Sequence, residues 1–175
     1  MALAFLSPEL GKWDLLAAAP NGPPELLALP FFVDERPLRG AAGLVDWRLC
    51  GRLSRLLLGA RVAGTFGEST LLPPSRRLPF TKLLLYGLGP SERFDEARYK
   101  EAVSGIRQVA ARLGVLRYAL ALPGRSTGMI MARRALELWL ESAEPPADPR
   151  TEVWLVEPQA AQKEMSEALG RSARR

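Results

Sequence analysis

Short apolar runs alternate along this chain with longer segments of helical periodicity. The clearest run is Leu83 to Tyr86, which has the length and polarity of a strand buried on both faces. Gly87 and Gly89 end it, and residues 91–114 then show the spacing of an amphipathic helix. A strand, a glycine turn and a helix in succession form half of a βαβ unit, so the sequence predicts an α/β fold.

The same alternation extends over most of the chain and predicts a three-layer α/β/α arrangement with a mixed, mostly parallel sheet. Ala2 to Leu6 is expected to form an edge strand, and Pro30 indicates a bend or a sheet edge in its own strand. The other strands are expected at residues 26–33, 67–72, 82–88, 117–123 and 152–157. Helices are expected at residues 44–58, 95–113, 129–142 and 159–169.

The length and composition are typical of an ordinary globular protein. A chain of 175 residues with 47% apolar residues predicts a single domain, residues 1–175. No apolar run approaches the length of a membrane helix, and the N-terminus lacks the basic residue that opens a signal peptide, so we expect no membrane partner. The single Cys50 excludes an internal disulfide framework and favours a cytoplasmic protein.

The basic residues allow two interpretations. The net charge is +5, and most of the 24 basic residues are arginines, which either favour phosphate-bearing partners or reflect coding bias. Within the expected helix at 44–58, three arginines share one face, and two more precede the central strand. If this set forms a patch, it predicts sequence-independent, salt-dependent DNA binding. The candidate residues are Arg48, Arg52, Arg55, Arg76 and Arg77.

Several classes of chemistry are excluded. Histidine is absent, which excludes histidine-ligated zinc and catalytic pairs of serine or cysteine with histidine. One cysteine cannot form a thiolate cluster, and the carboxylates are scattered, so we expect no metal and no cofactor. The sequence also lacks a Walker lysine motif and a GxGxxG fingerprint.

Two glycine-containing loops remain as ligand-binding candidates, because each leads directly into an expected helix. Small residues let backbone N–H groups approach a ligand, and a helix N-terminus favours an anion. Each loop taken alone is also what a plain strand-to-helix connection needs. The candidates are Gly40, Ala41 and Gly43 in the first loop, and Gly124, Arg125, Ser126, Thr127 and Gly128 in the second.

Residues 40–114 resemble the N-terminal domain of cytosolic leucyl aminopeptidases. The resemblance rests on Leu56-Leu57, GTFGES at 64–69, KLLLYGLG at 82–89 and SGIRQVAARLG at 104–114. That domain is related to the macro domain, a three-layer α/β/α module. The second half is similar to a macro domain as well: residues 121–142 resemble its second phosphate loop and the helix that follows, and residues 152–158 resemble its last strand.

The resemblance limits what activity to expect. The family's catalytic domain, with its acidic two-metal cluster, has no counterpart in these residues, so we expect no peptidase activity. The asparagine-rich strand end of ADP-ribose hydrolases would fall at residues 32–35, where no asparagine stands. The resemblance therefore leaves the binding of a phosphate-bearing nucleotide open and argues against ADP-ribose hydrolysis.

The remaining hypothesis is an interaction module that binds another protein or itself. Apolar side chains beyond the needs of the core would anchor such a partner. The candidates are Trp13, Trp47 and Leu58, which could equally be part of the core. Some bacterial aminopeptidases of this family bind DNA, and their N-terminal domain takes part, so the resemblance also leaves the DNA alternative open.

Overall fold

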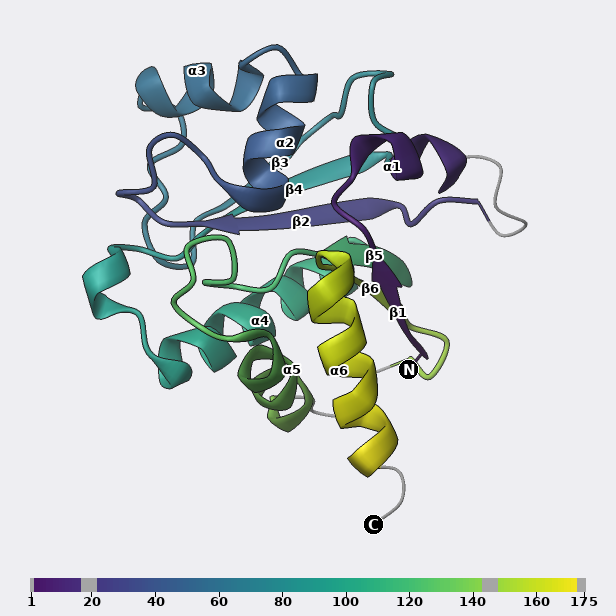
Figure 1. Ribbon diagram of the computed structural model, residues 1–175. Helices are drawn as coiled ribbons and strands as arrows, with labels where there is room; N and C mark the ends of the chain where they lie inside the picture. Colours follow the sequence, from purple (N-terminus) through teal and green to yellow (C-terminus); the bar gives the residue numbers. More distant parts are fainter. Residues whose placement is uncertain (1, 17–21, 143–147, 173–175) are drawn as a thin grey trace.

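A mixed β-sheet runs through the middle of the molecule (Figure 1). The computed structural model describes residues 2–16, 22–142 and 148–172, and in this part of the chain six strands pair in the order β1-β6-β5-β2-β4-β3. All neighbours are parallel except β3, which runs antiparallel to β4. The strands are β1 (Ala2–Leu6), β2 (Leu26–Phe31), β3 (Ser69–Leu72), β4 (Lys82–Gly87), β5 (Arg117–Leu120) and β6 (Glu152–Val156).

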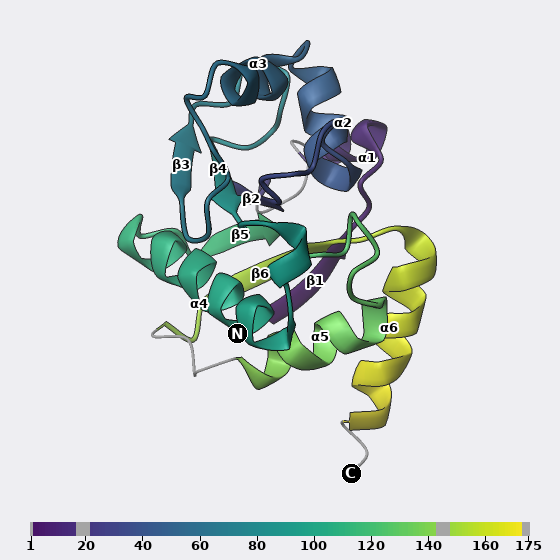
Figure 2. The ribbon, with the colours of Figure 1, turned by 90° about the vertical axis from the view of Figure 1, so that its left-hand side faces the viewer.

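Helices cover both faces of this sheet, which makes three layers (Figures 1 and 2). One face packs against α1 (Leu10–Leu16), α2 (Gly40–Arg48) and α3 (Arg52–Leu58). The other packs against α4 (Glu96–Arg112), α5 (Ala132–Glu141) and α6 (Gln159–Ser172). Each interface has its own apolar cluster, so the nearly continuous apolar runs of β2 and β4 follow from burial on both sides.

The predicted fold class is confirmed, and most predicted elements are present with shorter bounds. Ala2–Leu6 is the expected edge strand. The sheet-edge alternative for Pro30 is wrong, because β2 is an internal strand between β5 and β4. The paired residues of β2 and β5 end at Ala28 and Leu120, before Pro30. The nitrogen of Pro30 faces β5 beyond this last pair, so the missing N–H of proline removes no hydrogen bond between strands.

The single helix predicted at residues 44–58 is two helices. Cys50 and Gly51 both have a positive φ, of 55° and 75°, and this left-handed pair separates α2 from α3. Asp46 stabilises the break, because its carboxylate accepts hydrogen bonds from the backbone amides of Leu53 at 2.7 Å and Ser54 at 3.1 Å. The arginines at 48, 52 and 55 therefore do not form one helical stripe.

The helix α1 was not predicted, and it changes the assignment of Trp13. The indole is fully buried, stacks edge-on against Phe80 with ring centroids 5.5 Å apart, and donates from Nε1 to the Ser7 carbonyl at 2.6 Å. The prediction that Trp13 is a surface anchor is wrong. Trp47 and Leu58, in contrast, are 75% and 82% exposed. Among the described residues, no helix combines the length and the apolar character needed to span a bilayer.

Candidate functional site

The loops that follow β2, β4, β5 and β6 lie at one edge of the sheet. These four strands are adjacent and mutually parallel, so their carboxyl ends meet there, the usual position for a ligand in an open α/β sheet. We call this region the strand-end site. Its polar and aromatic side chains are Glu35 after β2, Phe94 after β4, Arg125 and Ser126 after β5, and Glu157 after β6.

The two predicted loops meet in the strand-end site. Gly40, at the start of α2, has a φ of +53°, and a Cβ built on it would lie 2.8 Å from the Cβ of Ser126. The first loop therefore needs glycine at this position both for its left-handed backbone and for its contact with the second loop. The structure brings Gly40 and Ser126 together, with little space between them.

Glu35 ties these loops to one another. Its carboxylate accepts hydrogen bonds from the backbone N–H of Arg39 at 2.9 Å and of Phe32 at 3.3 Å, and from the Ser126 hydroxyl at 3.4 Å. The residue is only 6% exposed, and burial raises the pKa of Glu35 although these hydrogen bonds oppose the shift. A carboxylate of the protein itself thus lies beside the N-terminus of α2.

Arg125 is held by a second buried carboxylate. Its Nε and Nη2 donate to the two oxygens of Glu157 at 3.1 and 3.0 Å, and its Nη1 donates to the carbonyl of Ile130 at 2.9 Å. Glu157 is 1% exposed. Burial raises the pKa of Glu157, and the guanidinium of Arg125 opposes that shift. This two-pronged pair fixes the loop between β5 and α5 against the end of β6.

The remaining candidates of the second loop also have internal contacts. A Cβ on Gly124, which has a φ of +72°, would lie 2.5 Å from the ring of Phe94. That ring packs edge-on against Phe32 with centroids 4.9 Å apart. The Thr127 hydroxyl donates to the Gly124 carbonyl at 3.3 Å, and Gly128 faces open space.

The candidates of the first loop differ from one another in their surroundings. Ala41 lies in the first turn of α2 and is buried in the apolar cluster between this helix and the sheet. Gly43 lies so close to the chain that a Cβ there would be 2.4 Å from the carbonyl oxygen of Leu38. Gly43 also lines the cavity described below, on the outer side of α2, rather than the contact with the second loop.

These contacts define what the strand-end site can do. The side chains expected to bind phosphate are bonded to the protein itself, and both nearby buried groups are carboxylates, which repel a phosphate when ionised. The charge of Arg125 is already balanced by Glu157, which weakens its attraction for an anion. The buried carboxylates were missed from the sequence; the only signal was that Glu157 directly follows a buried strand.

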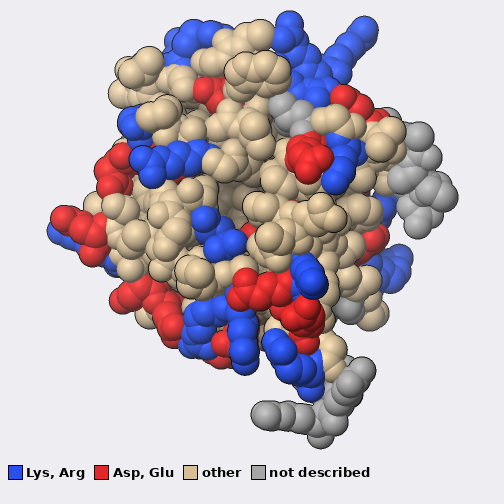
Figure 3. Space-filling view, in the orientation of Figure 1, with Lys and Arg blue, Asp and Glu red and all other residues tan. Residues whose placement is uncertain are grey.

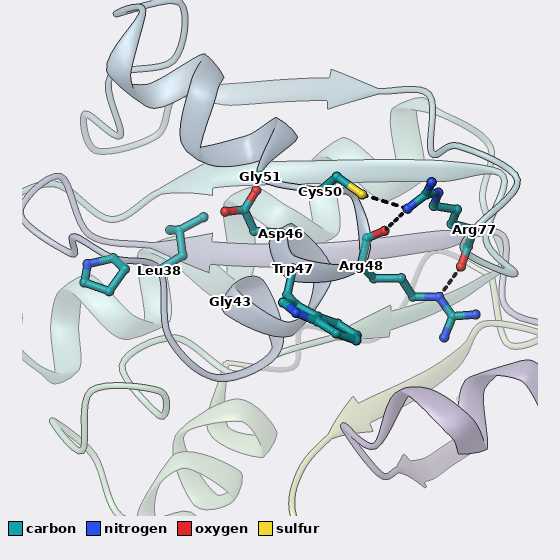
Figure 4. A pocket seen from close by; sticks show the side chains of 9 residues that line it. Leu38, Gly43, Asp46, Trp47, Arg48, Cys50, Gly51 and Arg77 are labelled. Atoms are coloured by element: carbon teal, nitrogen blue, oxygen red, sulfur yellow. Dashed lines mark hydrogen bonds between the residues drawn. The ribbon is translucent and has the colours of Figure 1, made fainter.

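A separate cavity of about 860 Å³ lies on the outer side of α2. Figure 4 shows Leu38 at one end and Arg48 and Arg77 at the other, with Trp47 between them in this view. Arg77 Nη1 donates to Cys50 Sγ at 2.8 Å and to the Arg48 carbonyl at 3.3 Å. The lining residues are Pro37, Leu38, Gly43, Asp46, Trp47, Arg48, Cys50, Gly51 and Arg77.

Two of the candidate basic residues, Arg48 and Arg77, line this cavity, and Arg76 is exposed beside Arg77 in the sequence. Arg55 Nη1 donates to the Cys50 carbonyl at 2.7 Å, and Arg52 Nη1 donates to the Pro73 carbonyl at 2.9 Å. Arg48 bonds to the Arg77 carbonyl and forms an ion pair with Asp14 of α1. Figure 3 shows basic side chains at the upper end of the molecule, on both sides of a mostly uncharged area. In the described ranges, no three metal-ligating side chains come close enough to hold an ion.

The amino-acid sequence matches a known protein family. Residues 28–143 match the model of the cytosol aminopeptidase family, N-terminal domain. A probable cytosol aminopeptidase of Cyanothece sp. is 29% identical over 99 residues, which cover 57% of this chain and 20% of that relative. A probable cytosol aminopeptidase of Picosynechococcus sp. is 29% identical over 116 residues, 65% of this chain and 24% of the relative. The match spans a quarter or less of these relatives.

Solved structures show the same fold at low sequence identity. The macrodomain of Trypanosoma brucei in complex with ADP superposes with a TM-score of 0.68 at 12% identity, over 96% of this chain and 69% of that chain. A mutant of tomato leucine aminopeptidase superposes with a TM-score of 0.60 at 15% identity, over 97% of this chain and 35% of that chain. The fold is therefore macrodomain-like.

Proposed function

We propose that this chain, which belongs to the N-terminal domain family of the cytosol aminopeptidases, is a non-catalytic module that binds another protein. The observation that carries the proposal is the position of Trp47, whose indole is 75% exposed beside a cavity on the outer side of α2. A large aromatic side chain kept in solvent next to a concave surface is typical of a binding hot spot. Leu58, 82% exposed on α3, adds apolar surface at the same end of the molecule.

The hydrogen bonds within the strand-end site favour this proposal over a catalytic role. Its arginine and its hydroxyl groups are bonded to Glu157, Glu35 and a backbone carbonyl, so they stabilise the loops. The sequence contains no histidine to act as a general base near neutral pH. We therefore assign the strand-end site a structural role and the outer side of α2 the binding role.

Quantitative affinity purification from cells that express the chain tests the proposal. The wild type should enrich a protein partner, and Trp47→Ala should lose most of it, because removing a hot-spot tryptophan costs about 2 kcal/mol or more. Met131→Ala is the matched control, since Met131 is 70% exposed on the opposite face of the sheet. Equal recovery with both variants would contradict the proposal.

Self-association is the other form of the same proposal, and sedimentation velocity at several protein concentrations separates the two. A monomer at every concentration would leave a different protein as the partner. A concentration-dependent dimer that Trp47→Ala abolishes would identify a second copy as the partner.

Nucleotide binding in the strand-end site is a second candidate. It is favoured by the contact of Gly40 with Ser126, which places two glycine-containing loops and a helix N-terminus together in a macrodomain-like fold. Calorimetric titration with ADP-ribose, ADP and AMP tests it. Absence of heat and of a thermal shift at millimolar ligand would end this candidate.

A further inference from the structure

The chain's positive charge is concentrated on the segment that forms the outer side of α2 and α3. Residues 36–82 contain nine basic and two acidic side chains, so the segment carries a formal charge of +7 while the whole chain carries +5. Of the two acidic groups, Asp46 is buried and accepts the amides of α3. Glu68 is partly exposed, and its carboxylate accepts the amide of Gly64 at 2.7 Å.

Three arginines of this segment are oriented by backbone carbonyls and form no ion pair in the described part of the chain, whereas Arg48 pairs with Asp14 and Lys82 with Glu25. Arg52, Arg55 and Arg77 each donate to a backbone carbonyl, which fixes the guanidinium in place and leaves its positive charge uncompensated. These bonds use one or two of the five N–H donors of each side chain. Ordered guanidinium groups with donors to spare suit carboxylates, which they bind with two parallel hydrogen bonds.

The cavity adds an apolar requirement to this charge. Pro37 and Leu38 are among its lining residues. In Figure 4 Leu38 lies at one end and Arg77 at the other, and the exposed indole of Trp47 lies between them. A ligand that covers this surface must present an apolar group within a side chain's length of a negative charge. A polyanionic backbone without apolar groups would pair with the arginines and leave the apolar lining in water.

We propose that the occupant is an acidic protein segment that carries an aromatic side chain, which packs against Trp47 while its carboxylates pair with the arginines. This inference rests on the proposed function and names the chemistry of the partner. A second copy of the chain is disfavoured, because a two-fold contact through this face would set Arg52, Arg55 and Arg77 against identical positive groups.

The test uses the full chain and a random copolymer of glutamate and tyrosine, with polyglutamate as the probe that lacks aromatic groups. Fluorescence anisotropy should show that the copolymer binds at least about tenfold more tightly at equal salt. Trp47→Ala should reduce copolymer affinity to that of polyglutamate, and Met131→Ala should not. Each variant's folding is checked by its melting temperature, which an exposed position should leave near the wild-type value.

The charge requirement has its own matched pair of variants. The double variant Arg76→Gln/Arg77→Gln should lower the affinity for both polymers by about tenfold and reduce the dependence of that affinity on salt concentration. Arg112→Gln/Arg171→Gln removes two exposed arginines from α4 and α6 and should leave both affinities unchanged.

Four outcomes would overturn the inference. Equal binding of the two polymers, or copolymer binding that does not depend on Trp47, would remove the aromatic requirement. Duplex DNA that binds more tightly than the copolymer at equal salt would identify a nucleic acid as the occupant. A partner recovered through Trp47 that has no acidic segment, with no copolymer binding, would refute the acidic occupant while the proposed function stands.

Discussion

Removal of the Arg125 guanidinium should destabilise the protein strongly, because Glu157 would remain buried without its ion-pair partner. The pair is well formed, with two contacts of 3.0 and 3.1 Å, and the side chains of Arg125 and Glu157 are 18% and 1% exposed. Breaking a buried pair from one side costs about 3–5 kcal/mol, and the partial exposure of Arg125 favours the lower end. For a chain of this size, about 3 kcal/mol corresponds to a fall in melting temperature of roughly 6–12 °C.

The assay is differential scanning calorimetry of wild type, Arg125→Ala and Arg125→Ala/Glu157→Gln at about pH 8 and about pH 5. Burial raises the pKa of Glu157 and Arg125 opposes it, so loss of the arginine raises that pKa further. The folded state of the single variant then takes up a proton as the pH falls, which removes the unpaired charge. Its destabilisation should therefore be smaller at pH 5.

The double variant separates the lost charge pairing from the lost packing. With a neutral glutamine at 157, the cost should fall to about 1–2 kcal/mol, the range for missing hydrogen bonds. Arg125→Lys is the second comparison, since it keeps the charge and loses the two-pronged geometry. An Arg125→Ala cost that does not change with pH, or a double variant less stable than the single one, would refute the reasoning.

Three further predictions concern the loops and the activity. Burial raises the pKa of Glu35, so the wild type loses stability as the pH rises through that pKa and the buried carboxyl ionises. Glu35→Gln has no such group, so its stability relative to wild type should increase between about pH 5 and about pH 8. A relative decrease measured by urea unfolding would contradict this. Gly40→Ala should cost about 1–2 kcal/mol for its left-handed backbone plus the clash with Ser126, and more than Gly128→Ala, where φ is also positive but the space is open; equal unfolding energies would show that the clash is absent. Purified protein should not cleave leucine anilides when manganese or zinc is added, with an intact relative as the positive control; metal-dependent turnover would contradict the non-catalytic proposal.

The layer arrangement could be predicted because its signals are local. The run Leu83 to Tyr86, the glycines after it and the helical spacing beyond Ser91 each occupy neighbouring positions, and local patterns of this kind determine element type. The break between α2 and α3 was missed although Gly51 marked it, because leucines on both sides continued the helical spacing. The cap that stabilises the break comes from Asp46, several positions away, which no periodicity reveals.

The candidate sites were predicted only in outline, because their chemistry depends on pairs distant in sequence. The loops around Gly40 and Ser126 were found from their composition, and the structure brings these residues together. That Arg125 is paired with Glu157, 32 positions later, could not be predicted from the spacing. Burial of an aromatic side chain is equally non-local: Trp13 and Trp47 both lie in helical segments, and only the packing of α1 against the sheet separates core from surface.

Site-specific photo-crosslinking in living cells tests the central claim most directly. A photoreactive amino acid is placed in the full chain at Trp47, in the strand-end site at Ser126, and at Met131 as the control, since Met131 is exposed on the opposite face. A partner that binds the outer side of α2 predicts a protein adduct at position 47 and none at positions 126 and 131. Adducts at 126 or 131 without one at 47 would contradict the account.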